Sequence, residues 1–343
     1  MLKPGVVRII LALTVVAFHI SKLLPLGEFA VLSFFMLSGY WITLMYENKY
    51  SKSSVVNFYV SRFWRLLPVF ILFNAITILL KSIYDHQVFL SLMANRSVGF
   101  YLSNIFILGL NTVKRFPLAP AWSLDLELQY YLLFPLLYMI FKKKDIFLYI
   151  VAAVSFIVLI IHTLLIPVTE ISTTVFPLLF FFIVGMIIFL KKLTFSVRTE
   201  LIFNGMFFFI LLLIYCIPVL RAHTLKDPYC DFNHYLNTAL PLFLIPFFSN
   251  SVRRKSDQTD RAIGEMSFVL YLAHWALIAP YNYYSRDLSF VQRLPYTIGY
   301  LVITLGLSYL LFRFYDKPID NLRRKWVESK IKGPQEKHSL IKK

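Results

Sequence analysis

Arg8 and His19 are the residues of the first apolar segment whose side chains could do chemistry. They lie eleven residues apart in the run VVRIILALTVVAFHI. Eleven steps of about 100° bring both side chains to one face of a helix, about 16 Å apart along its axis. A guanidinium in that position could hold an anion, and an imidazole, which titrates near neutral pH, could act as a general base.

Each of these residues also has a structural explanation. Arg8 could be an interfacial anchor whose charge sets the topology, and His19 could make a hydrogen bond between packed helices. Ionisable groups are costly within a membrane and usually face a protein interior or a water-filled cavity. The position of Arg8 and His19 on one helix face therefore favours a helix that lines an interior path through the protein.

Arg62 and Arg65 form a second group of cations in the run RFWRLLP, where a spacing of three residues places them on one helix face. Forked guanidinium groups suit phosphate, but arginines also serve as positive-inside anchors. Ser38 and Gly39, in SFFMLSGY, are small enough to allow close approach by a helix or a ligand. For both pairs the structural and the functional interpretation stay open.

Two later motifs place polar groups in apolar segments. The run AWSLDLELQYYLLFP carries Glu127, with tyrosines three and four residues further along the same helix face. The run GEMSFVLYLAHW carries Tyr271 and His274. Helix packing and a functional role are equally open for these last two side chains.

The composition indicates an integral membrane protein. The chain has 343 residues, 58% of them hydrophobic, and a mean hydropathy of +0.67. Repeated apolar runs of about 18 residues or more are typical of transmembrane helices, and they leave no room for a large soluble domain. The net charge of +17 falls between these runs, so we expect contacts with membrane lipids and no nucleic-acid partner. No metal-ligand cluster is apparent, and no metal is predicted.

We expect an all-α, polytopic membrane protein with about ten transmembrane helices. If the short segment 98–111 does not cross, 25 of the 35 basic residues fall on one side, which the positive-inside rule assigns to the cytoplasm together with both termini. This segment is therefore predicted to be re-entrant or interfacial. A membrane domain is expected over 1–320 and a basic cytoplasmic tail over 321–343. The expected spans are about 6–24, 27–46, 63–80, 121–141, 146–167, 174–190, 201–220, 235–248, 263–281 and 295–314.

Taken together and in order, these motifs resemble acyltransferase family 3, the integral membrane O-acyltransferases that include bacterial O-antigen and exopolysaccharide O-acetyltransferases. The resemblance rests on Arg8 with His19, SFFMLSGY, RFWRLLP, WSLDLELQYYLLFP, GEMSFVLYLAHW and YDKP, and it covers almost the whole chain. The last motif has Asp316 where the family often has another acidic residue, Glu.

The resemblance implies a protein of the bacterial inner membrane that moves an acyl group, most often acetyl, from cytoplasmic acetyl-CoA or another acyl-CoA. The acceptor would be a hydroxyl of a cell-surface or lipid-linked carbohydrate such as O-antigen, capsule or exopolysaccharide. His19 would be the general base or a covalent acyl carrier. The implied roles are catalytic for His19, Glu127 and Arg8, donor-binding for Arg62, Arg65, Ser38 and Gly39, and acceptor-binding for Trp122, Tyr271 and His274.

The alternative is a transporter or flippase for an anionic or lipid-linked glycan. Buried arginines and a histidine would suit a charged substrate and proton coupling. A transporter would show no dependence on acyl-CoA and no modified product. Transporters often contain an inverted repeat, and none is apparent in this sequence.

Overall fold

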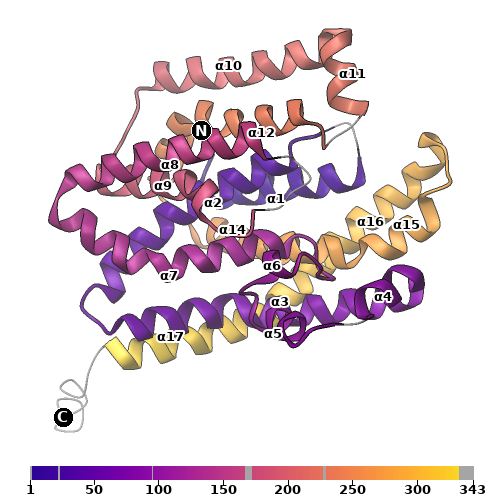
Figure 1. The fold of residues 1–343 in the computed structure, drawn as a ribbon, viewed down its shortest axis with the longest axis horizontal. Helices are drawn as coiled ribbons and strands as arrows, with labels where there is room; N and C mark the ends of the chain where they lie inside the picture. The colour runs from indigo at the N-terminus through magenta and orange to yellow at the C-terminus, as the bar shows by residue number, and fades with distance from the viewer. Residues whose placement is uncertain (1, 22–23, 95, 167–171, 227–228, 332–343) are drawn as a thin grey trace. The chain divides into compact units, whose positions relative to one another are not determined.

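The computed structural model describes residues 2–21, 24–94, 96–166, 172–226 and 229–331 (Figure 1). Across these ranges the chain forms helices and turns and no β-strand, which confirms the predicted all-α class. Among the residues that the structure describes, six helices are long and apolar enough to cross a membrane. A seventh span results if α14 (Gln258–Ala276) and α15 (Ile278–Ser285), which are bent by 44°, count as one. The predicted total of about ten spans stays a prediction.

The helices follow one another with short connections. In chain order they are α1 (Pro4–Ile20), α2 (Gly27–Met45), the π-helical turn η1 (Tyr46–Tyr50), α3 (Val55–Tyr84), α4 (His86–Met93), α5 (Val98–Phe106), α6 (Leu110–Val113), α7 (Ala121–Lys143), α8 (Asp145–Leu165), the 3₁₀ turn η2 (Phe176–Leu178), α9 (Leu179–Leu190), α10 (Val197–Cys216), α11 (Pro218–Lys226), α12 (Asp231–Phe243), α13 (Ile245–Ser251), α14 (Gln258–Ala276), α15 (Ile278–Ser285), α16 (Phe290–Leu311), the π-helical turn η3 (Phe312–Asp316) and α17 (Lys317–Ile331).

The chain divides into two compact units, whose boundaries fall inside α2, α7 and α14. Unit 1 comprises Met1–Trp41 and Ile140–His274, and unit 2 comprises Ile42–Met139 and Trp275–Lys343. In unit 1, α8 packs on α9 and α12, and α12 also packs on α10. In unit 2, the yellow α17 runs beside the purple α3 (Figure 1), and α3 also contacts α15, α4 and α5.

Burial differs sharply between the helices of unit 1. In α9, Phe181, Phe182 and Ile183 are fully buried, as expected of a helix that is apolar on all sides. By contrast, α10 exposes 64% of Leu201 and 66% of Phe208. Large apolar side chains exposed along a 20-residue helix need a lipid environment, which supports a multi-pass membrane protein.

Two of the predicted segments differ from the helices of the structure in where they begin or break. The third segment begins at Val55, eight residues before the predicted start, because the Ser54 side chain caps the helix by accepting a hydrogen bond from the Val56 N–H. The segment predicted over 235–248 is interrupted at Leu244 between α12 and α13. Pro246 explains the interruption, since it cannot donate a backbone hydrogen bond to the preceding turn.

The short segment 98–111 also takes a definite form. Its helix α5 has nine residues, which give about 14 Å of rise, whereas a bilayer core is about 30 Å thick. Ile107 then ends the helix with a φ of 69°. A helix of this length is too short to cross a bilayer by itself. The re-entrant or interfacial placement of this segment stays a prediction.

The start of the predicted tail is helical. Residues up to Ile331 belong to α17, which packs along α3. Buried Arg323 and Val327 explain this contact. The division into a membrane domain and a cytoplasmic tail stays a prediction. The rest of the predicted tail, 332–343, lies outside the described residues.

Candidate active site

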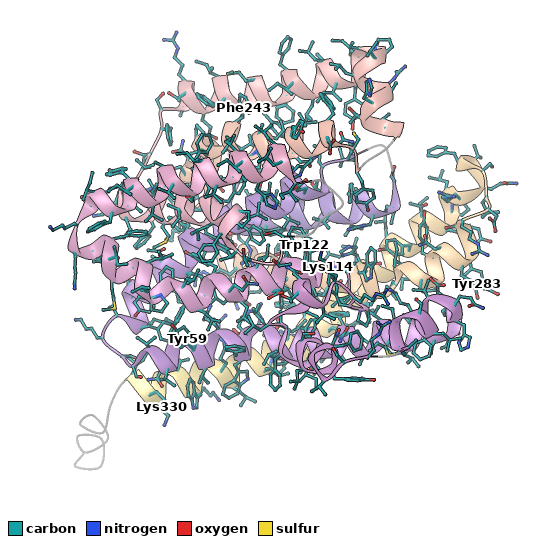
Figure 2. The ribbon with its side chains drawn as sticks, in the orientation of Figure 1. Tyr59, Lys114, Trp122, Phe243, Tyr283 and Lys330 are labelled. Carbon is teal, nitrogen blue, oxygen red and sulfur yellow. The ribbon has the colours of Figure 1, made fainter. Side chains whose placement is uncertain are left out.

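The predicted site residues divide between the two units, and each group is described by itself. Unit 1 carries Arg8, His19, Ser38, Gly39, Tyr271 and His274, whereas unit 2 carries Arg62, Arg65, Trp122 and Glu127. Figure 2 shows Trp122 at the start of α7.

In unit 1, α1 and α14 pack closely where both begin. A Cβ atom added at Gly5 would lie 1.8 Å from the Asp260 carbonyl oxygen, and one added at Gly264 would lie 3.0 Å from the Gly5 Cα. The buried carboxylate of Asp260 also accepts a hydrogen bond from the Val6 N–H at 3.0 Å. Only glycine at these positions allows the two backbones to approach so closely.

This contact sets the register of the two helices. His19 lies fourteen residues after Gly5, and His274 lies fourteen residues after Asp260. Fourteen residues correspond to about 21 Å of helix, so parallel neighbours bring the two histidines to the same level. The imidazole rings indeed stack, with centroids 5.3 Å apart and an angle of 24° between their planes.

The stacked pair is set among aromatic side chains. His274 is fully buried, and the Tyr271 ring lies 6.1 Å from it. Phe18 packs edge-on against His19 at 5.0 Å, and Phe34 packs edge-on against Tyr271 at 6.1 Å. The sequence motifs from the two ends of the chain therefore meet: His19, Tyr271 and His274 form one group, as a shared role requires.

The N-terminus of α1 is held by an ion pair outside the apolar segments. Lys3, just before α1, forms a salt bridge with Asp257, just before α14. The Lys3 hydrogen bond lowers the pKa of the Asp257 carboxyl, and the same bond raises the pKa of Lys3. Both side chains are exposed, so this pair is a weaker constraint on register than the glycine contact.

Gly39 lies where α2 packs on α9. A Cβ atom at Gly39 would lie 2.0 Å from the Phe182 carbonyl oxygen, and one at Gly185 would lie 2.0 Å from the Met36 carbonyl oxygen. Helix packing therefore accounts for glycine at position 39. A donor contact for Ser38 and Gly39 stays a prediction.

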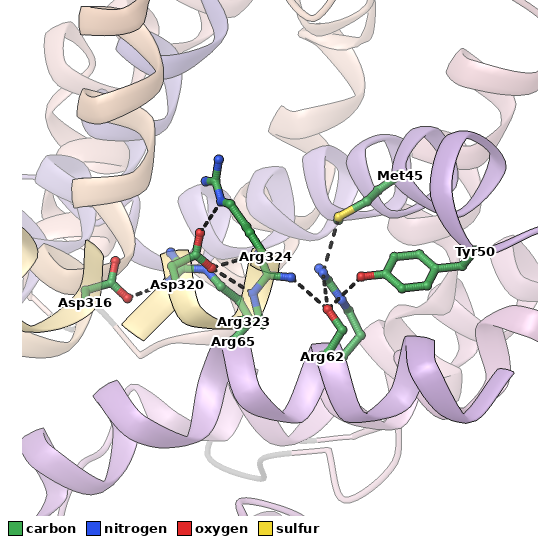
Figure 3. Close-up of polar contacts among 9 residues, drawn as sticks. Met45, Tyr50, Arg62, Arg65, Asp316, Asp320, Arg323 and Arg324 are labelled. Carbon is green, nitrogen blue, oxygen red and sulfur yellow. Dashed lines mark hydrogen bonds and ion pairs between the residues drawn. The ribbon is translucent and has the colours of Figure 1, made fainter. Parts of the chain in front are cut away.

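In unit 2, Arg62 and Arg65 occupy different environments on α3. Arg62 is only 4% exposed, and its Nη2 lies 3.2 Å from the Met45 sulfur and 3.3 Å from the Ser61 hydroxyl. Arg65 forms a salt bridge with buried Asp316 (Figure 3). The two cations therefore do not form one symmetrical clamp in this structure.

Helix α17 contributes three charged residues that the sequence analysis did not single out, namely Asp320, Arg323 and Arg324. Buried Asp320 accepts hydrogen bonds from Arg323 at 2.8 Å and from Arg324 at 2.6 Å (Figure 3). Arg323 also donates to the Ser61 hydroxyl at 2.7 Å. The spacing of Asp320 from these arginines, three and four residues, is the helical ion-pair pattern that could have indicated them.

Glu127 is held within its own helix by a hydrogen bond from the Tyr131 hydroxyl, four residues away, as the spacing predicts. The neighbouring Asp125, which was not among the predicted site residues, has a structural role. Its fully buried carboxylate accepts hydrogen bonds from the backbone N–H groups of Gly109 at 3.1 Å and Asn111 at 2.8 Å. It thereby fixes the 107–113 segment, which includes α6, to α7.

The two groups of residues offer different chemistry, and the expectation that no metal is bound stays a prediction. In the part of the chain that the structure describes, no group of three His, Cys, Asp or Glu side chains could hold a metal ion. The buried arginines of unit 2 offer several N–H donors, which phosphate groups accept readily. The stacked imidazoles of unit 1 offer proton acceptors.

A family model described as an acyltransferase domain matches residues 4–313, nearly the whole chain. The chain belongs to acyltransferase family 3. This confirms the resemblance seen in the motifs, which come from both units.

Individual relatives match over shorter stretches. A Staphylococcus aureus (strain COL) protein named as an O-acetyltransferase is 32% identical over 149 residues, which cover 39% of this chain and 24% of that protein. Peptidoglycan O-acetyltransferase OatA of Listeria monocytogenes is 29% identical over 40% of this chain and 24% of its own length. O-acetyltransferase OatA of Staphylococcus aureus (strain NCTC 8325) is 28% identical over a stretch that covers 46% of this chain and 30% of that protein. The chain thus spans less than a third of these relatives' length, and no solved structure matches it.

Proposed function

We propose that this protein is a multi-pass membrane O-acetyltransferase. It moves an acetyl group from cytoplasmic acetyl-CoA to a hydroxyl of a cell-surface or lipid-linked carbohydrate, from the inner membrane of a bacterium and with both termini cytoplasmic. Family membership over 4–313 and the O-acetyltransferase names of the relatives support the reaction class. One of these relatives is named for peptidoglycan, which supports a surface carbohydrate as the class of acceptor.

The stacked pair of His19 and His274 is the observation that carries this proposal. His19 takes the proton of the acceptor hydroxyl as its oxygen attacks the thioester carbonyl carbon. The new C–O bond forms, the C–S bond breaks, and the imidazolium returns its proton to the departing CoA thiolate. Because two positive charges at ring contact repel, the pair accepts one proton and His274 helps to locate it.

The proposal also gives roles to three other predicted residues. Arg8 follows Gly5 by one helical turn and approaches Gly264, so it supplies positive charge near the close contact of α1 and α14. In unit 2, Glu127, oriented by Tyr131, offers a carboxylate to sugar hydroxyls. Trp122, on the first turn of the same helix, offers an aromatic face for a sugar ring.

Mass spectrometry of surface glycans from the producing cell tests the proposal. The comparison includes the intact gene, a deletion, His19→Ala and the control His86→Ala, which removes an exposed histidine from α4. We expect loss of one acetyl mass in the deletion and in His19→Ala, with polymer still at the surface, and no change in His86→Ala.

Other outcomes separate the alternatives. Full acetylation in His19→Ala at normal protein abundance would refute its catalytic role. Polymer that is missing from the surface of the deletion strain, with the remaining glycan unchanged in mass, would instead favour the transporter.

A further inference from the structure

Helices α15 and α16, which pack side by side in unit 2 (Figure 1), leave a groove between them. The groove has a volume of about 400 Å³, and volumes of about 300–1,000 Å³ are usual for sites that bind small molecules. Its lining is apolar and aromatic, and it includes Tyr281, Tyr284, Tyr296, Tyr300 and Gly299. None of these residues has a role in the proposed reaction.

The back of the groove is formed without a ligand. The buried rings of Tyr281 and Tyr300 pack with their centroids 4.9 Å apart. The Tyr281 hydroxyl forms a hydrogen bond with the Thr297 hydroxyl at 3.0 Å. Gly299 keeps the groove open, because a Cβ atom at this position would meet nothing within 4 Å. A ligand would therefore enter a preformed apolar surface.

The opening of the groove faces the surroundings of the helix pair. Tyr296 is 46% exposed there, and Ile303, further along the lining, is 61% exposed. Helix α16 is part of a segment that is long and apolar enough to cross a membrane, so these surroundings are lipid. An apolar groove in contact with hydrocarbon is filled by a hydrocarbon chain, since water is absent from the bilayer core.

One end of the groove carries a fixed cation. Tyr296 and Tyr300 follow Arg293 by three and seven residues, which is the spacing of one helix face. The Arg293 Nε donates to the Ser285 carbonyl at 3.1 Å, and its Nη2 donates to the Arg286 carbonyl at 2.9 Å. These two bonds hold the guanidinium at the end of α15 and leave its Nη1 donors for another acceptor.

The turn between α15 and α16 has one positive charge in excess. Arg286 forms a salt bridge with its neighbour Asp287 at 3.3 Å, so these two charges balance. Arg293 forms no salt bridge with any residue in the described part of the chain. An apolar groove with one cation at its end matches a lipid with a hydrocarbon chain and an anionic headgroup.

We propose that the groove between α15 and α16 binds an anionic phospholipid, with one acyl chain against the tyrosines and the phosphate at Arg293. Tyrosine rings suit this position, because they are enriched where acyl chains meet headgroups. In the predicted topology the 286–289 turn lies on the outer side, so the lipid would come from the outer leaflet. This site does not depend on the proposed acetyl transfer, since it requires only that the protein spans a membrane.

Native mass spectrometry of the purified full-length protein in neutral detergent tests this site. The probes are phosphatidylglycerol, phosphatidylcholine with the same acyl chains, and a polyprenyl phosphate. Phosphatidylglycerol should bind about fivefold more tightly than phosphatidylcholine, whose choline brings a second positive charge next to Arg293. Arg293→Gln should remove this preference, because the amide carries no charge.

Two glycines of α16 provide a matched pair of variants. Gly299→Leu places a side chain in the groove, whereas Gly306→Leu places the same side chain two turns further along, outside the lining. A Cβ atom at either position meets nothing within 4 Å, and leucine favours a helix over glycine, so both variants should melt at or above the wild-type temperature. We expect Gly299→Leu to weaken phosphatidylglycerol binding by about tenfold or more and Gly306→Leu to stay within about twofold.

Each of the other outcomes would overturn the proposal. Equal binding of the two phospholipids, or a preference that persists in Arg293→Gln, would show that Arg293 does not hold the headgroup. Phosphatidylglycerol binding that Gly299→Leu leaves unchanged would show lipid spread over the apolar surface instead of one chain in the groove. Preferential binding of the polyprenyl phosphate, lost in Gly299→Leu, would assign the groove to an isoprenoid lipid instead of a phospholipid.

Discussion

Replacing Gly5 with alanine should separate α1 from α14 and slow acyl transfer. The added Cβ would lie 1.8 Å from the Asp260 carbonyl oxygen, which is a backbone atom and cannot rotate away. An ordinary contact starts at 3.4 Å. The helices must therefore move apart by about 1.6 Å or slide past each other, as happens when a close-packed interface is overfilled.

The expected loss of activity follows from the stacked histidines. α1 runs without interruption from Gly5 to His19, so a shift at its start moves the imidazole away from His274. A misplacement of about 1 Å can reduce a rate by about 10²-fold. We expect a loss of that order in transfer, and destabilisation by about 1–3 kcal/mol from overpacking.

Two other glycines make a graded series. Gly264→Ala places a Cβ 3.0 Å from the Gly5 Cα and requires a smaller shift, so its loss of activity should be intermediate. Gly205→Ala, on α10, meets nothing within 4 Å and is the matched control. The assay is the release of ester-linked acetate from surface glycans in cells that express each variant, normalised to the protein in the membrane.

Equal activity of the Gly5 and Gly205 variants, at equal abundance, would show that the glycine contact does not set the position of His19. A loss of activity caused only by low protein abundance would point to stability instead of register.

Three further substitutions test other parts of the structure. His274→Phe keeps an aromatic ring beside His19 but removes both nitrogens, and transfer should fall by about 10²-fold if the pair handles the proton; unchanged acetate release would confine His274 to packing. Asp125→Asn weakens the buried hydrogen bonds to the 107–113 segment and should cost about 1–3 kcal/mol, seen as a lower melting temperature. Gly39→Ala places a Cβ 2.0 Å from the Phe182 carbonyl oxygen and should also lower the melting temperature, whereas normal stability with weaker CoA binding would favour the predicted donor contact.

Much of the architecture follows from local sequence properties. Apolar runs predicted most of the long helices, since every peptide group in a bilayer must form its hydrogen bond within the segment. Helix periodicity placed Glu127 next to Tyr131, which the structure confirms. The boundaries were less accurate: Ser54 starts α3 earlier than the apolar run does, and Pro246 interrupts a run that hydropathy alone makes continuous.

The sequence by itself determined the fold class, the family and the helix faces on which reactive side chains lie, because these depend on neighbours within a few turns. Only the tertiary structure decided which side chains meet. His19 stacks on His274, and Arg323 reaches Ser61 across 262 residues of chain. Such pairs depend on how closely helices approach and in which register, as at Gly5 and Asp260. Periodicity within one helix carries no information about that approach.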